Sequence, residues 1–73
     1  MEERPLSALN CIKMFGGVLN GFILRNTCDK CMTAVIKWQP SNNNTEYQIE
    51  GHSDITVKLQ DKTATLIDEY SCK

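Results

Sequence analysis

The sequence has no excess of charge of either sign and few aromatic side chains. Its 73 residues include eight Lys and Arg against nine Asp and Glu, which gives a formal net charge of −1, and aromatic residues make up 7%. Nucleic-acid phosphates and anionic lipids are bound by concentrated positive charge, which this chain does not have. We therefore expect no nucleic acid among its ligands.

A long apolar run is also missing. The most apolar stretch, residues 14–24, is interrupted by three Gly and one Asn, whereas a membrane-spanning helix needs about 20 consecutive apolar residues. The start of the chain is charged and contains Pro5, unlike the basic and then apolar start of a secretory signal. We expect no membrane span and no signal segment in this sequence.

Groups that could support catalysis are scarce. His52 is the only His, and no Ser-His-acid arrangement can be assembled around it. The Gly16-Gly17 pair lacks the rest of a phosphate-binding motif. Asp68 and Glu69 are adjacent, and adjacent strand residues point to opposite faces, so we expect both to be solvated rather than to share a cation. We therefore expect a protein that is not an enzyme.

The chain is long enough for one domain only, and a domain of this size has little apolar surface to bury. We expect an irregular N-terminal arm over residues 1–7 and a single small domain over residues 8–73. Natural domains of this length often add disulfides, a metal or a partner, because burial and ordering nearly cancel. The four Cys are therefore the first residues to consider.

The pattern of apolar residues predicts strands and almost no helix. Alternation is clearest at residues 55–60, and β-branched residues dominate Thr33–Trp38. Further strands are expected at residues 46–50 and 63–68, with a hairpin of 17–19 and 22–25 around an Asn20-Gly21 turn. Residues 8–15 fit a strand or a short helix, and Gly16-Gly17 reads as a break. The expected links are the polar loop Ser41–Thr45, the turn at residues 51–54, and Asp61-Lys62.

These elements predict an all-β or mainly β fold. The last four strands are expected to form an antiparallel meander that closes into a small barrel or a two-layer sandwich. Trp38, Tyr47 and Phe22 are expected to pack in the core rather than to form a stacking platform for bases. The full predicted core is Ile23, Ala34, Ile36, Trp38, Tyr47, Ile49, Ile55, Val57, Leu59, Ala64 and Leu66.

The Cys residues favour a disulfide framework that stabilises the β domain. They lie at positions 11, 28, 31 and 72, and an even number of Cys in a short chain is typical of an oxidising compartment. Four Cys allow three pairings, and the sequence leaves all three open: Cys11–Cys28 with Cys31–Cys72, Cys11–Cys31 with Cys28–Cys72, or Cys28–Cys31 with Cys11–Cys72.

Two alternative uses of the same Cys remain. Cys28-Asp-Lys-Cys31 has the spacing of a zinc knuckle, so Cys11, Cys28, Cys31 and Cys72 could together bind zinc in a cytoplasmic regulatory or inhibitor domain. His52 could replace one ligand. The same two Cys could instead form a redox dithiol, although the segment that follows is predicted as a strand, whereas a reactive dithiol sits at a helix N-terminus.

The leading interpretation is a binding module without a cofactor, located in the periplasm or outside the cell. Its partner would be a protein or a surface ligand. Loops on a rigid scaffold are common binding sites, so we consider the Ser41–Thr45 loop, the Gly51–Ser53 turn and the edge strands as candidate surfaces. Met14-Phe15 is either a partner-binding or dimer face or part of the core.

Overall fold

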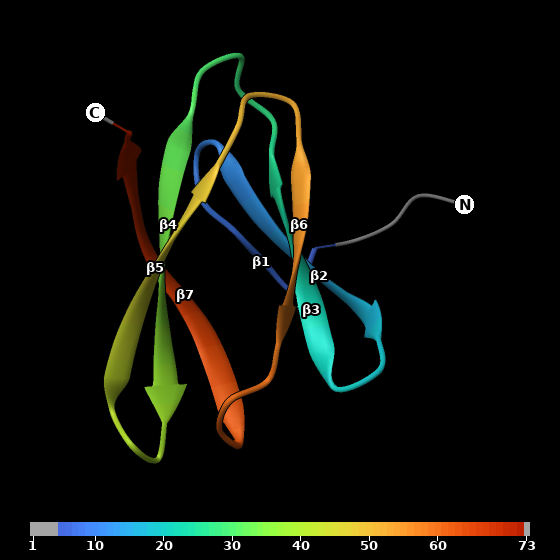
Figure 1. The fold of residues 1–73 in the computed structure, drawn as a ribbon, viewed down its shortest axis with the longest axis vertical. Coiled ribbons are helices and arrows are strands. Elements are labelled where there is room, and N and C mark those ends of the chain that lie inside the picture. The colour runs from blue at the N-terminus through green and yellow to red at the C-terminus, as the bar shows by residue number, and fades with distance from the viewer. Residues whose placement is uncertain (1–4, 73) are drawn as a thin grey trace.

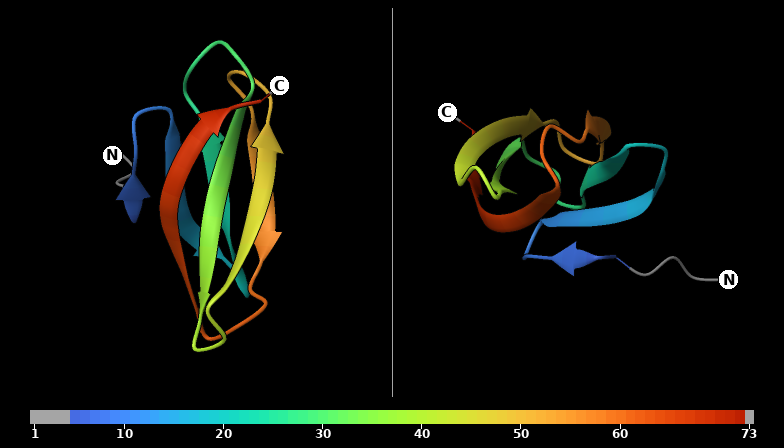
Figure 2. Two further views of the ribbon diagram at one scale, coloured as in Figure 1. Left: turned by 90° about the vertical axis from the view of Figure 1, so that its left-hand side faces the viewer. Right: turned by 90° about the horizontal axis from the view of Figure 1, so that it is seen from below.

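The computed structural model describes residues 5–72, which form a sandwich of two antiparallel sheets (Figures 1 and 2). One sheet has the strand order β1-β2-β3-β6 and the other has the order β5-β4-β7. The all-β prediction is confirmed, and the two sheets close as a sandwich rather than as a barrel. The strands are β1 (Ser7–Ala8), β2 (Ile12–Val18), β3 (Gly21–Asn26), β4 (Met32–Gln39), β5 (Asn43–Ile49), β6 (Asp54–Lys58) and β7 (Thr63–Ser71).

The central strand β4 explains why residues 33–38 read as a continuous apolar run. Its inner side chains, among them Ala34 and Ile36, belong to the core between the sheets. Thr33 and Val35 point to the other face, yet they are only 3% and 8% exposed, because β5 and β7 flank the strand on both sides. A strand that is buried on both faces needs no polar alternation.

The predicted meander of the last four strands is wrong. After β5 the chain crosses to the sheet β1-β2-β3-β6, where Val57 of β6 pairs with Phe22 of β3. The chain then returns to the sheet β5-β4-β7, where Ala64 of β7 pairs with Trp38 of β4. The alternation of residues 55–60 correctly indicated a half-buried strand. It carried no information about which of the two sheets that strand joins.

The N-terminal segment departs from its prediction at two points, Ser7 and the Gly16-Gly17 pair. Ser7 was expected in an irregular arm but lies in β1, while residues 1–4 fall outside the described part of the chain. The ambiguous segment 8–15 contains a strand, since β2 begins at Ile12. The expected break at Gly16-Gly17 is an irregularity within β2, where the register shifts between Phe15 and Val18.

The β2–β3 hairpin is confirmed, but its turn is displaced by one residue. Val18 pairs with Gly21, so the turn consists of Leu19 and Asn20. Asn20 adopts a φ of 57°, which Asn tolerates better than most residues. Gly21 is required for another reason: a Cβ at this position would collide with the carbonyl oxygen of Val57 on the neighbouring strand.

The link after β4 is shorter than predicted, the link after β5 is displaced by one residue, and the link after β6 is longer. The turn after β4 ends at Asn42, so residues 43–45 belong to β5 rather than to a polar loop. Asp54, which was assigned to a turn, begins β6. Strand β6 ends at Lys58, and residues 59–62 therefore form the connection to β7.

Most of the predicted core is confirmed. Nine of its eleven members are buried or pack partly buried against the core: Ala34, Ile36, Trp38, Tyr47, Ile49, Ile55, Val57, Ala64 and Leu66. The assignment of Ile23 to the core is wrong, because β3 buries Phe22 and Leu24 and the residue between them points outward. The assignment of Leu59 is also wrong, because β6 ends before this residue and its side chain is 42% exposed.

The prediction missed core residues in the N-terminal third, where no period was clear. Ile12, Met14 and Leu24 are at most 3% exposed and belong to the core. Phe15 points to the outer face of its sheet, where it pairs with Ile23. The expected packing of Phe22 and Trp38 is confirmed, since their ring centroids are 5.9 Å apart.

Candidate functional site

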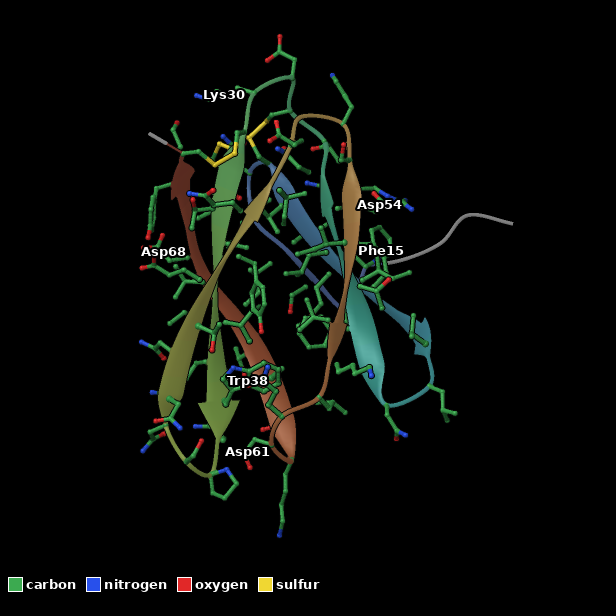
Figure 3. The ribbon with its side chains drawn as sticks, in the orientation of Figure 1. Phe15, Lys30, Trp38, Asp54, Asp61 and Asp68 are labelled. Atoms are coloured by element: carbon green, nitrogen blue, oxygen red, sulfur yellow. A yellow bond between two sulfur atoms is a disulfide. The ribbon has the colours of Figure 1, made fainter. Side chains whose placement is uncertain are left out.

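The four Cys form two disulfides, Cys11–Cys28 and Cys31–Cys72, with Cα–Cα distances of 5.3 and 5.4 Å. Each disulfide closes one end of a pair of neighbouring strands. The first joins the start of β2 to the end of β3, and the second joins the start of β4 to the end of β7. Figure 3 shows both at the same end of the sandwich. The disulfide framework is confirmed, and the pairing that the sequence left open is assigned.

This arrangement gives the Cys28–Cys31 segment a structural role. Cys28 and Cys31 belong to different disulfides, and the residues between them carry the chain from one sheet to the other. A redox dithiol would join Cys28 to Cys31 in its oxidised form, whereas each of them is paired with a more distant Cys. A zinc site would need the thiolates that these two disulfides replace. Within residues 5–72, no group of three or more His, Cys, Asp or Glu is arranged to hold a metal ion.

Asn26 fixes this crossover from inside. Its side chain is 0% exposed, and its Nδ2 donates hydrogen bonds to the carbonyl oxygens of Lys30 at 2.7 Å and Ile49 at 3.0 Å. Its Oδ1 accepts a hydrogen bond from the amide of Cys28 at 3.0 Å. The sequence analysis missed this residue, although it continues the inward alternation of Phe22 and Leu24 along β3.

The Gly51–Ser53 turn packs on the crossover instead of forming an independent surface. The amide of His52 donates a hydrogen bond to the carbonyl oxygen of Cys28 at 3.0 Å. A Cβ on Gly51 would collide with the backbone of Asp29. This candidate surface is therefore part of the disulfide end of the sandwich, whose backbone is held by side chains and disulfides.

Glu69 connects the two sheets near the disulfide end. Its carboxylate accepts hydrogen bonds from the amide of Cys11 at 2.9 and 3.0 Å and from the amide of Ile12 at 3.0 Å. Glu69 faces inward because Val35 pairs with Asp68 and Ile36 with Leu66, which leaves Ile67 as an extra residue in a bulge. The expectation that Glu69 is merely solvated is therefore wrong, since it joins β7 to the start of β2.

The outer face of the β1-β2-β3-β6 sheet carries a cross-strand ion pair. Arg25 and Asp54 face each other in the ladder, and the guanidinium donates from Nε at 2.9 Å and from Nη2 at 3.0 Å. The hydrogen bond from Arg25 holds the pKa of Asp54 below its ordinary value. Arg25 also lies over the ring of Phe15, 4.7 Å from its centroid, so it covers that ring from solvent.

The opposite end of the sandwich, away from the disulfides, has an apolar groove. The groove has a volume of about 260 Å³ and lies between the sheets on the β1–β7 side. Its exposed walls include Leu6, which is 68% exposed, and Leu59, which is 42% exposed. The lining residues are Leu6, Met14, Gly21, Phe22, Leu59, Lys62, Thr63 and Ala64.

A third exposed leucine is not among the lining residues of the groove. Leu19 occupies the tip of the β2–β3 hairpin and is 89% exposed. The amide of Leu59 donates a hydrogen bond to the carbonyl oxygen of Asn20 at 2.8 Å, which places Leu59 next to the hairpin tip. We refer to Leu6, Leu19, Leu59 and the groove as the apolar end. Sequence reasoning missed it because Leu59 was assigned to the core.

Polar contacts hold the connection that forms one wall of the groove. The carboxylate of Asp61 accepts hydrogen bonds from the amide of Ser41 at 3.0 Å and from the amide of Lys62 at 2.8 Å. Hydrogen bonds from Ser41 lower the pKa of Asp61 most, and the Lys62 amide adds to this effect. The turn that contains Ser41 therefore holds the β6–β7 connection in place next to the groove.

Comparison with family models finds no match, and searches of curated proteins and of solved structures find no significant match. The described residues include no helix that is long and apolar enough to cross a membrane.

Proposed function

We propose that this protein is a non-enzymatic binding module of an oxidising compartment, the periplasm or the cell exterior, and that it binds a protein partner through its apolar end. The observation that carries this proposal is an apolar groove with two exposed leucines, Leu6 and Leu59, in its walls, and a third, Leu19, at the neighbouring hairpin tip.

The energetics favour a partner at this position. Burying a leucine side chain contributes about 1.5–3 kcal/mol relative to leaving it in water. Single exposed leucines are common on protein surfaces, but a contiguous group beside a hollow is typical of an interaction site. The side chains of Met14 and Phe22 form the floor of this groove and already belong to the rigid core.

The frame of the protein supports binding without rearrangement. The groove walls come from both sheets, and the sheets are fixed to each other by the Glu69 carboxylate. The two disulfides close the strand pairs at the other end. A preorganised surface loses less conformational entropy on binding, so more of the burial energy appears as affinity.

The covalent chemistry supports the proposed compartment. Disulfides persist in secreted and periplasmic proteins and are rare where glutathione and thioredoxin keep thiols reduced. Two disulfides in 73 residues therefore support export as the working location of this protein.

A peptide selection tests this proposal. The oxidised protein is presented to a phage library of random peptides of about nine residues, which is long enough to form one strand. We expect enriched peptides to bind Leu6→Ser and Leu59→Ser variants at least about tenfold more weakly. The matched control is Tyr70→Ser, a similarly exposed side chain on the outer face of the other sheet, which should change binding by less than about twofold.

Three results would contradict the proposal. The selection could enrich no peptide, the enriched peptides could bind the leucine variants as well as the wild type, or sedimentation could show a dimer that the Leu59→Ser variant dissociates. The last result would assign the apolar end to self-association. Thermal unfolding of each variant should match the wild type within about 0.5 kcal/mol, since these side chains are exposed.

A further inference from the structure

One long edge of β7 has no strand partner in its sheet. Strand β7 is the last strand in the order β5-β4-β7, and β1, which belongs to the opposite sheet, lies near it. Figure 2 shows these two strands along one side of the sandwich. Unpaired amides and carbonyls along such an edge can accept a further strand.

The backbone of Ala64 points toward this free edge. The carbonyl oxygen of Trp38 accepts a hydrogen bond from the amide of Asn42 at 2.7 Å, so it points toward β5. Ala64 is the residue opposite Trp38 on β7. In an antiparallel ladder, residues opposite each other either exchange both hydrogen bonds or direct both groups away. Ala64 therefore directs its N–H and C=O away from β4.

The half of β7 nearest the disulfides is blocked against strand addition. Ile67 forms a bulge, the amide of Glu69 donates to its neighbour Asp68 at 2.8 Å, and the Glu69 carboxylate binds the start of β2. Bulges and local side-chain bonds are typical ways of protecting an edge. Between Thr63 and Leu66 the register is regular.

The groove lies beside this regular stretch. Thr63 and Ala64 of β7 line it, and so does Leu59 in the connection that precedes the strand. In a strand added to β7, every second side chain would point inward toward the groove, while the others would face solvent. Ala64 has a small side chain, which leaves room for a larger one on the added strand.

The wall of the groove carries one positive charge. Lys62 lines the groove and is exposed. The neighbouring carboxylate of Asp61 accepts hydrogen bonds from the amides of Ser41 and Lys62. An acidic group on the ligand would complement Lys62.

We propose that the partner supplies an extended segment that adds to the free edge of β7 over Thr63–Leu66, places alternate apolar side chains in the groove, and carries an acidic residue beside Lys62. This inference rests on the proposed function and states how the apolar end is used. The recognition mode is β-strand addition, in which backbone hydrogen bonds give affinity and pockets for alternate side chains give specificity.

The peptides selected on the oxidised protein provide the probe. We expect their sequences to alternate apolar and polar residues and to contain Asp or Glu at one end. A peptide with N-methyl groups on one alternate set of amides should bind at least about tenfold more weakly, while methylation of the other set should change binding by less than about twofold. Only a bound strand distinguishes the two sets, because its amides alternate in direction.

Two protein variants test the same edge. Ala64→Pro removes the amide that points to the free edge of β7, and it should weaken binding at least about tenfold. Asn44→Pro is the matched control, because Asn44 lies on the other edge strand, β5. Its neighbour Asn43 pairs with Trp38 and faces β4, so the amide of Asn44 points away from β4. Proline is tolerated on an edge strand where the amide faces solvent. The charge-reversal variant Lys62→Glu should also weaken binding about tenfold.

The outcomes separate the two proposals. Peptides that lose binding to Leu59→Ser but respond equally to both N-methylated sets would overturn strand addition and leave the apolar end as the binding surface. Binders without acidic residues, or with full affinity for the lysine variant, would overturn the charge requirement. Peptides that ignore Leu59→Ser would overturn both proposals. The N-methylated peptides keep the test decisive even if Ala64→Pro does not fold.

Discussion

The carboxylate of Glu69 accepts two hydrogen bonds from the amide of Cys11, at 2.9 and 3.0 Å, although Cys11 directly precedes a strand of the other sheet and lies 58 positions away. The same carboxylate also accepts a hydrogen bond from the amide of Ile12 at 3.0 Å. The edge of one sheet is thereby fixed to the start of β2 in the other, next to a disulfide-bonded residue. Hydrogen bonds therefore stabilise the contact between the two sheets at this point, in addition to the packing of the core.

Removing the hydrogen bonds to Glu69 should destabilise the fold. Glu69→Ala leaves two part-buried amides without their acceptor, and we expect a loss of about 1–3 kcal/mol in the free energy of unfolding. Urea denaturation of the oxidised protein measures this. Glu50→Ala is the matched control, because Glu50 is exposed and should change stability by less than about 0.5 kcal/mol. Equal effects of the two substitutions would refute the role of Glu69.

Asn26 should tolerate even an isosteric change poorly. In Asn26→Asp the amide nitrogen that donates to the carbonyls of Lys30 and Ile49 becomes an oxygen, which places a buried charge against two acceptors. We expect a loss of more than about 3 kcal/mol at neutral pH. Denaturant unfolding measures it, with the exposed Asn44→Asp as the control. A loss below about 1 kcal/mol would show that the Asn26 network is not required.

The two disulfides should contribute unequally. They join residues separated by 17 and 41 positions, and in the chain-entropy model such loops contribute about 3 and about 4 kcal/mol. We therefore expect the Cys31→Ala/Cys72→Ala variant to unfold at a lower temperature than Cys11→Ala/Cys28→Ala. Calorimetry of both variants tests the order. The reverse order would mean that contacts near Cys11, such as the Glu69 bonds, outweigh loop length.

The Arg25–Asp54 pair should give a small acid-dependent term. Its hydrogen bond lowers the pKa of Asp54 in the folded state, so the stabilisation is complete above the unfolded pKa of about 3.9 and is lost as the pH falls through the lower folded value. The side chains are 39% and 44% exposed, and exposed pairs contribute about 0.2–1 kcal/mol.

The substitution Asp54→Asn isolates this term. We expect the difference in unfolding free energy between wild type and variant to shrink as the pH is lowered from about 5 to about 2. Urea titrations at several pH values measure it, and added salt should also reduce the difference because the pair is exposed. A difference that stays constant across this range would show that the ion pair does not stabilise the fold.

The sequence predicted elements better than their arrangement. Alternation and β-branched residues located β4, β5, β6 and β7, because each of these strands has a face that must be buried. The assignment of β6 to the sheet of β3 was not predictable, since antiparallel neighbours and crossovers both connect through short links. The N-terminal strands were missed in part because the Gly16-Gly17 irregularity interrupts the period of β2.

The candidate site was predicted even less completely. Disulfide formation followed from the number of Cys, but the pairing depends on which strand ends lie side by side. The apolar end is formed by residues from distant segments, since Leu6 and Leu59 meet only when both sheets are assembled. Glu69 faces inward because of a bulge at Ile67, and nothing in the local sequence distinguishes that bulge from a regular strand.

The disulfide map is the most direct test of this account, because the sheet arrangement, the groove and the proposed compartment all depend on it. Trypsin cleaves after Lys13, Arg25, Lys30 and Lys37 and so separates all four Cys, including Cys28 from Cys31. Digestion without reductant, with thiols blocked, should give two linked pairs: the peptide containing Cys11 with residues 26–30, and residues 31–37 with the peptide containing Cys72. A link between residues 26–30 and 31–37, or four alkylated thiols, would contradict the fold described.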